Sequence, residues 1–169
     1  MSLLVRKIER AKWMQNDIVN GAPVSADAIT NCAKTTGNAL STWRVTDASA
    51  LDDAVLAMSS RFDHLDSIDV VALEESALAA AGLIIVATCG PTAIESLVRT
   101  HRDIVELTYA SLGTVANLIV QEFKADRVHR FTKGRLRKLL MEAINGGVLR
   151  AHDLKQSVRS EVDRPQSTS

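Results

Sequence analysis

Four short apolar runs, each of a length suited to a β-strand, alternate with helical patterns over the first ninety residues. The runs are residues 3–8, 40–45, 68–73 and 83–87. Helical patterns fill the intervals between them, starting near Ser25, near Ser49 and at residue 74. Strands that alternate with helices are typical of α/β proteins, in which crossover helices join the strands of one sheet. We therefore expect an α/β fold with a small sheet of about four strands that is at least partly parallel.

The pattern changes after residue 90, and the rest of the sequence has helical periodicity. Apolar residues recur at roughly helical spacing across residues 94–123, a span longer than the ~8–20 residues of an ordinary globular helix. Either one long helix or a break near residues 100–103 would satisfy this pattern. We expect another helix to begin at Thr132 and a last one to cover about 151–162. The sheet is therefore expected to be followed by a helical C-terminal portion.

Length and composition indicate one globular domain. The chain has 169 residues, 46% of them hydrophobic, and its 20 basic residues balance 20 acidic ones. Such averages exclude a disordered or collagen-like protein. We expect a single domain over residues 1–162, with its sheet-containing part at 1–90, its helical part at 91–162 and a frayed polar tail at 163–169.

No segment of the sequence predicts insertion into or passage across a membrane. No apolar run approaches the ~18 residues that a transmembrane helix needs. The N-terminal residues place charge directly after their few apolar positions, which is not typical of a signal peptide. We expect a cytoplasmic protein of bacterial origin that makes no membrane contact.

Cysteine and histidine spacing gives no indication of a metal site or a cofactor. Cys32 and Cys89 are far apart and are expected to be reduced thiols, and the four histidines are scattered. Asp63, Asp66 and Asp69 recur at every third position, but the spacing lacks the central glycine of a calcium loop. No metal or cofactor is expected.

Charge is distributed unevenly along the chain. Residues 47–75 carry eight acidic side chains and one basic one, for a net charge of −7, and residues 124–138 carry seven basic side chains and one acidic one, for a net charge of +6. These two stretches are called the acidic segment and the basic segment below. They could pack against one another or form ordinary solvated faces, could steer a protein partner, or, for the basic segment, could contact the phosphates of a nucleic acid.

Another candidate site lies where the fourth expected strand gives way to the expected long helix. There, Thr88, Cys89, Gly90 and Thr92 could line an anion crevice, because free backbone N–H groups gather between the end of a strand and the start of a helix. A helix dipole would lower the pKa of a cysteine at that position and make it a nucleophile. The simpler interpretation is a buried cysteine followed by a Gly-Pro turn.

These observations favour a non-catalytic interaction protein, a small or regulatory subunit of a multi-protein assembly. The expected contact residues come from both charged segments: Arg127, Arg130, Lys133, Arg135, Arg137, Lys138, Asp52, Asp53, Asp63 and Asp66. One alternative is a nucleic-acid-binding module that uses the basic segment. The other is a small cysteine-dependent enzyme at Cys89. The sequence does not indicate an oligomeric state.

Overall fold

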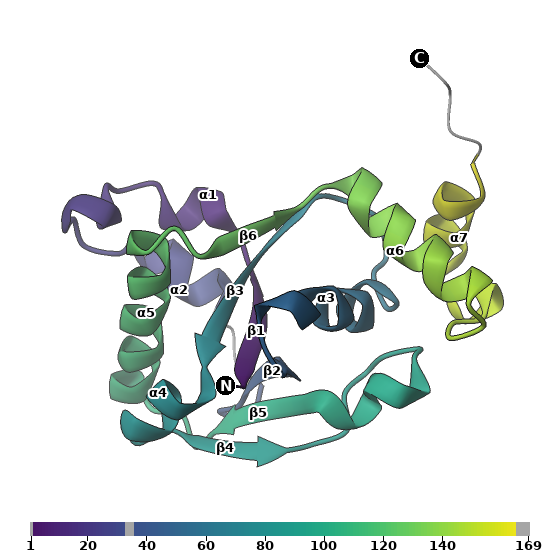
Figure 1. Cartoon of the computed structure of the whole chain (residues 1–169). Helices are drawn as coiled ribbons and strands as arrows, with labels where there is room; N and C mark the ends of the chain where they lie inside the picture. Colours follow the sequence, from purple (N-terminus) through teal and green to yellow (C-terminus); the bar gives the residue numbers. More distant parts are fainter. Residues whose placement is uncertain (1, 33–35, 165–169) are drawn as a thin grey trace.

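One six-stranded sheet forms the centre of the molecule. The computed structural model of the chain describes residues 2–32 and 36–164. The strand order is β4-β5-β2-β1-β3-β6, and every neighbouring pair is antiparallel. The strands are β1 (Leu3–Ile8), β2 (Leu40–Val45), β3 (Ile68–Glu74), β4 (Ile84–Ala87), β5 (His101–Val105) and β6 (Val128–Phe131). Figure 1 shows β4 and β6 at opposite ends of this sheet.

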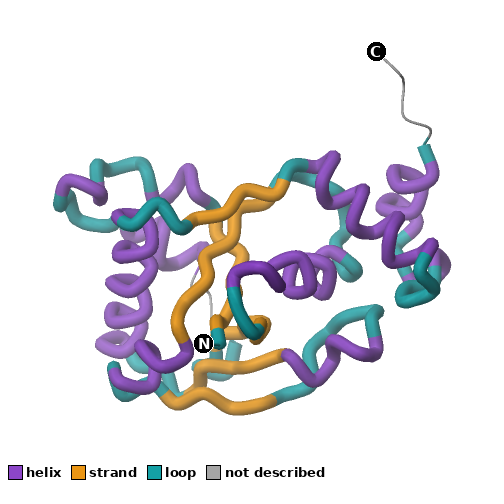
Figure 2. The backbone as a smooth tube through the Cα atoms, in the orientation of Figure 1, coloured by secondary structure: helices purple, strands orange, loops and turns teal. Residues whose placement is uncertain are grey.

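Helices cover both faces of the sheet, so the molecule has three layers (Figure 2). The α-helices are α1 (Arg10–Trp13), α2 (Ala26–Cys32), α3 (Leu51–Ser59), α4 (Glu75–Ala80), α5 (Tyr109–Lys124), α6 (Lys133–Asn145) and α7 (Gln156–Asp163). Four short 3₁₀ helices are η1 (Ile18–Asn20), η2 (Ala48–Ala50), η3 (Glu95–Thr100) and η4 (Ala151–Asp153). The α3, α6 and α7 helices pack on one face, and the remaining α-helices pack on the other.

Each face of the sheet has its own apolar core, and β1 contributes to both. Val5 belongs to the core beneath α3 and α6, whereas Leu4 and Ile8 belong to the core beneath α5. Successive side chains of a strand point to opposite faces, so an apolar strand in the middle of a sheet supplies both layers. The apolar sequence of β1 therefore reflects burial on both sides.

The expected parallel sheet is wrong, because every neighbouring pair is antiparallel and the strands joined by α3 and by α5 are not neighbours. The β2 and β3 strands, joined by α3, do run in the same direction, but β1 lies between them and pairs antiparallel with both. In the same way α5 joins β5 to β6 across the whole width of β2, β1 and β3. Alternation of strands and helices thus predicted that helices connect the strands, but it did not predict which strands pair or in which direction.

The expectation of only about four strands followed by an all-helical portion is also wrong, because β5 and β6 lie in that portion. In place of one long helix, the chain forms η3, then β5, then α5, which begins after the capping residue Thr108. The break expected near residues 100–103 is where β5 begins. Both additional strands are short and contain charged residues, so their apolar positions also fit a helical period.

Other local expectations are confirmed with small shifts. The four expected strands are all present, and Thr132 caps α6 by accepting a hydrogen bond from the N–H of Arg135. Ser25 likewise accepts from the N–H of Ala28 at the start of α2. Ser49 is not a cap, because Asp47 accepts its N–H at 2.8 Å and the helix starts only at Leu51.

The C-terminal helix expected over 151–162 is divided into η4 and α7. Of the tail expected to be frayed, Asp163 ends α7 and residues 165–169 lie outside the described part of the chain. Within the described residues, no helix combines the length and the apolar character that crossing a membrane requires.

Candidate functional site

Six of the seven bases of the basic segment contact acceptors of the same chain, whereas Lys124 makes no such contact with a described residue. The ion pairs are Arg127–Glu122, Arg130–Asp69, Lys133–Glu161, Arg135–Asp52 and Lys138–Glu142, and Arg137 donates to the carbonyl of Val162. The paired basic side chains nevertheless stay more than half exposed. Exposed pairs of this kind add little stability because water and salt screen them. Their main effect here is to neutralise the basic surface locally.

Two of these pairs join the basic segment to the acidic segment. Arg135 of α6 reaches Asp52 of α3 at 2.6 Å, and Arg130 of β6 reaches Asp69 of β3 at 3.2 Å. Among the other acids expected to bind a partner, Asp63 contacts Lys155 and Asp66 lines a surface groove, while Asp53 forms no ion pair with a described residue. Packing of the two segments against one another therefore accounts for two of these pairs, and the other charged contacts go to residues outside both segments or within one of them.

The residues of the proposed anion crevice do not converge on one point. Cys89 lies in the connection from β4 to η3 and is exposed, and its Sγ makes no hydrogen bond to a described residue. Thr92 faces inward, with its hydroxyl 3.0 Å from that of Ser60. The expected long helix is absent at this point, because the next helix is the short 3₁₀ helix η3, which begins at Glu95. The start of a long helix therefore does not supply free N–H groups to Cys89.

Thr88 instead belongs to a buried polar network with two residues of β5. Its hydroxyl lies 2.7 Å from Nδ1 of His101 and 2.9 Å from a carboxylate oxygen of Asp103. Because the carboxylate can only accept, the hydroxyl donates to Asp103 and accepts from the Nδ1–H of His101. The imidazole therefore holds Thr88 in place rather than removing its proton.

Burial changes the acid–base behaviour of His101. The ring is 4% exposed and meets Trp43 edge-on, with ring centroids 4.9 Å apart. Desolvation lowers the pKa of His101 from its ordinary value of 6.5, and the carboxylate of Asp103 opposes this shift only partly. His101 is therefore a neutral core residue of the folded protein at neutral pH.

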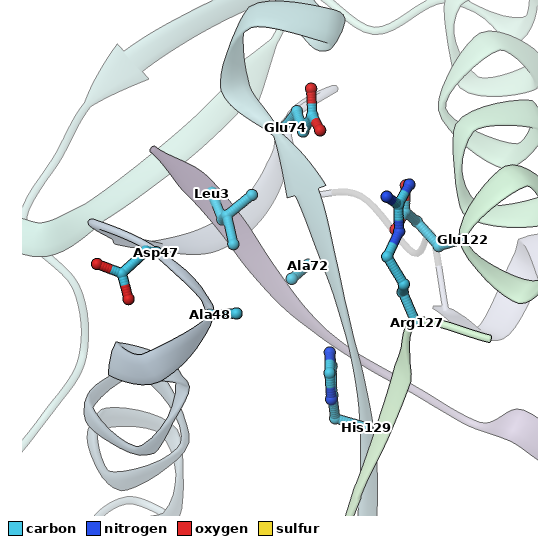
Figure 3. A pocket seen from close by; sticks show the side chains of 8 residues that line it. All are labelled: Leu3, Asp47, Ala48, Ala72, Glu74, Glu122, Arg127 and His129. Atoms are coloured by element: carbon cyan, nitrogen blue, oxygen red, sulfur yellow. The ribbon is translucent and has the colours of Figure 1, made fainter. Parts of the chain in front are cut away.

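A small pocket lies on the sheet face between η2 and β6. Its floor is apolar, and its lining consists of Leu3, Asp47, Ala48, Ala72, Glu74, Glu122, Arg127 and His129. Figure 3 shows Arg127 beside Glu122 on one side and Asp47 on the other. The volume is about 240 Å³, below the ~300–1,000 Å³ of typical small-molecule sites.

The charged groups of this pocket mainly serve the turn between α5 and β6. Asp126 has a left-handed backbone (φ 51°), which ends α5 and brings Arg127 back over the helix. Arg127 then donates two hydrogen bonds to the buried carboxylate of Glu122, at 2.8 and 2.9 Å. This contact raises the pKa of Arg127. No group of three potential metal ligands occurs here or elsewhere in the described residues.

The outer edge of β4 has a different character, because it is apolar and uncharged. Within the described residues β4 pairs only with β5. The side chains of Ile84 and Val86 are 47% and 40% exposed, and alternate residues of a strand share one face. Natural edge strands are commonly protected by charged residues, proline or a bulge. The sequence of β4, IIVA, supplies no charge and no proline.

The backbone of β4 also has groups directed away from the sheet. The N–H of Thr88 donates to the carbonyl of His101 at 3.3 Å, and these residues lie opposite each other. In an antiparallel pair the hydrogen-bonded positions alternate along the strand. The backbone N–H and C=O groups of Ile84 and Val86 therefore point toward β5, whereas those of Ile85 and Ala87 point outward. We call the outward backbone of Ile85 and Ala87, with the side chains of Ile84 and Val86, the β4 edge.

The opposite end of the sheet has the protection that the β4 edge lacks. The β6 strand contains His129 and Arg130, and Arg127 precedes it directly. Arg130 is paired with Asp69 and Arg127 with Glu122, so charged side chains occupy this end of the sheet. Of the two ends, only that of β4 is both apolar and uncharged.

Sequence reasoning found β4 as a strand but missed its position at the edge of the sheet. One signal was available: residues 76–94 contain no Asp, Glu, Lys, Arg or His. The absence of charge suggests burial, yet several of these residues are exposed, including Ala79, Ala80 and Ala87. An exposed apolar surface of this kind is typical of interaction sites.

Replacing Gly90 by alanine should test the packing around His101. A Cβ atom at Gly90 would lie 2.4 Å from Trp43 and 2.7 Å from His101. We expect Gly90→Ala to lose about 1–3 kcal/mol in the free energy of unfolding, measured by urea denaturation, because neither ring can retreat from the core. The matched control is Gly113→Ala within α5, which meets no atom within 4 Å and should gain about 0.5–1 kcal/mol. Equal stability of the two variants would refute the close packing at Gly90.

The neutral state of His101 predicts how stability changes with pH. Because its pKa is lower in the folded protein, the unfolded chain binds more protons, so stability is full above pH 6.5 and is lost as the pH falls through the folded pKa. We expect the free energy of unfolding to decrease from pH 7.5 to pH 5.5, and to decrease less in His101→Asn. An undiminished decrease in His101→Asn would contradict the burial of a neutral imidazole.

Comparison of the chain with protein-family models, with curated proteins and with solved structures found no match. Any functional conclusion therefore rests on the residues and geometry of this chain. Among the described residues, the β4 edge combines backbone groups that pair with no other strand and exposed apolar side chains.

Proposed function

We propose that the protein is a non-catalytic interaction protein, a subunit of a larger assembly, and that it binds an extended strand of a protein partner along the β4 edge. The observation that carries this proposal is the combination of outward-facing backbone groups with exposed apolar side chains on an uncharged strand. Strand addition is a recurring mode of protein recognition, in which main-chain hydrogen bonds provide affinity and alternate side chains provide selectivity.

The geometry of β4 suits this mode of binding. An added strand would pair with the backbone of Ile85 and Ala87, and its own side chains would cover Ile84 and Val86. Full burial of a valine or isoleucine side chain contributes roughly 1.5–3 kcal/mol. Ile84 and Val86 are already about half buried in the unbound protein. The apolar contact would thus add about 1–2 kcal/mol in total, and the pairing of backbone groups would add further affinity.

The charged segments have a secondary role in this proposal. Most of their bases already contact carboxylates or a carbonyl of the same chain, so a partner would have to compete with those contacts. Exposed charges can still increase the association rate and the selectivity of a complex. We therefore place the main contact at the β4 edge rather than on Arg135, Lys138 or their neighbours.

A charge placed within the β4 edge should abolish partner binding. In Val86→Lys the ammonium group would lie on the apolar face that the added strand covers, whereas in the unbound protein the exposed side chain would remain in water. We expect affinity capture from the native cytosol to recover the same partner with the wild-type chain and with the control Val148→Lys, but not with Val86→Lys. Val148 is a suitable control because it is a valine that is 52% exposed outside the β4 edge.

Two results would contradict the proposal. One is recovery of the partner by Val86→Lys at the wild-type level, and the other is equal loss with both variants. Circular dichroism of both variants should match that of the wild-type protein, which shows that the substitution acts on binding rather than on folding.

A further inference from the structure

A second small pocket, separate from the β4 edge and from the pocket of Figure 3, is lined by three arginines. It lies where the start of β1, the end of β2 and the start of β5 come together, and its volume is about 240 Å³. The lining residues are Ser2, Arg44, Val45, Thr46, Arg99, Thr100 and Arg102. No carboxylate is among them, which distinguishes this pocket from the one that contains Glu122 and Asp47.

Two of the three guanidinium groups are held in position by the chain itself. Arg102 donates from one terminal nitrogen to the carbonyls of Arg99 and His101, at 2.9 and 2.7 Å. Arg44 donates from Nε to Glu75 at 2.8 Å. Both contacts use only part of the donors of each guanidinium, which has five N–H groups. The remaining N–H groups are therefore available to an acceptor.

Arg99 is the least engaged of the three. Its side chain forms no ion pair and donates no hydrogen bond to a described residue. The nearby hydroxyls do not supply further donors, because Ser2 donates to Glu75, Thr46 to Asp47 and Thr100 to the carbonyl of Leu97. Any anion in this pocket would therefore be held by the guanidinium groups.

Glu75 does not neutralise the pocket. It is one carboxylate beside three guanidinium groups, and the hydrogen bond from Ser2, together with the charges of Arg44 and Arg102, lowers its pKa. Glu75 thus remains ionised and compensates one positive charge of three. With Asp47 beside Thr46 also counted, the three arginines still leave a net positive charge of about +1 at the pocket, which favours an anion.

We propose that this pocket binds the phosphate group of a small molecule. Arginine is the residue best suited to this task, since its planar fork gives paired hydrogen bonds to the oxygens of phosphate. Three arginines line this one small pocket, and a tetrahedral phosphate has more acceptor oxygens for their donors than a planar carboxylate. Free phosphate and a phosphate monoester share this chemistry. The proposal does not depend on binding at the β4 edge.

Isothermal titration calorimetry of the full chain with inorganic phosphate and with adenosine monophosphate tests this site. We expect Arg99→Gln to weaken phosphate binding by roughly tenfold or more. Arg99→Gln should fold as the wild-type protein does, because the side chain of Arg99 forms no ion pair and donates no hydrogen bond to a described residue. The backbone carbonyl that Arg102 contacts is retained. Arg102→Gln should weaken binding to a similar extent. The matched control is Arg150→Gln, which removes one arginine charge on a side chain that is 73% exposed and does not line the pocket.

Each outcome of this experiment bears on the proposal. Binding of either compound that is lost in Arg99→Gln and retained in Arg150→Gln supports the site, and tighter binding of the monophosphate identifies an ester as the ligand. Absence of binding in the wild-type protein, or equal weakening in Arg99→Gln and Arg150→Gln, would overturn it. Val86→Lys should bind phosphate as the wild-type protein does, so failure of this site and failure of the β4 edge are distinguishable.

Discussion

The position of β1 between β2 and β3 determines the rest of the fold. Its register is fixed over all six residues against β3, from Leu3 opposite Glu74 to Ile8 opposite Asp69. Its side chains supply the apolar cores on both faces of the sheet. A strand that is paired on both sides and buried on both faces cannot shift by one residue without exposing its apolar side chains. The remaining strands are added outward from this centre, and β4 and β6 become the two edges.

Local features of this architecture follow from the sequence, because they depend on neighbouring residues. The apolar runs predict four strands, and the hydroxyl of Thr132 marks the start of α6. Long-range pairing does not follow from such patterns. The insertion of β1 between two strands joined by α3 makes the sheet antiparallel, and no local signal reports it. In β5, the contacts of the buried His101 come from Trp43 and from Thr88, which follows β4, and no local pattern predicts them.

The charged segments illustrate the same limit for the candidate site. Their opposite signs can be read directly from the sequence, but the partners Asp52 and Arg135 are 83 positions apart. Sequence reasoning left open whether the segments bind a partner or pack against one another, and the fold pairs Arg135 with Asp52 and Arg130 with Asp69. The stretch without charge at residues 76–94 proved more informative, because the fold leaves part of it exposed on an edge strand. Apolar residues on the surface thus distinguish the β4 edge from the neutralised charges elsewhere.

The central claim is that β4 gains a further strand when the protein binds its partner. Amide hydrogen exchange of Ile85 and Ala87, measured by NMR in the isolated chain and in the captured complex, tests it most directly. The N–H groups of these residues point outward, so they should exchange rapidly in the isolated chain and slowly in the complex, while those of Ile84 and Val86 should be slow in both. Protection in the isolated chain that increases with protein concentration would identify a second copy as the partner strand. Rapid exchange of Ile85 and Ala87 in the complex would contradict strand addition at β4.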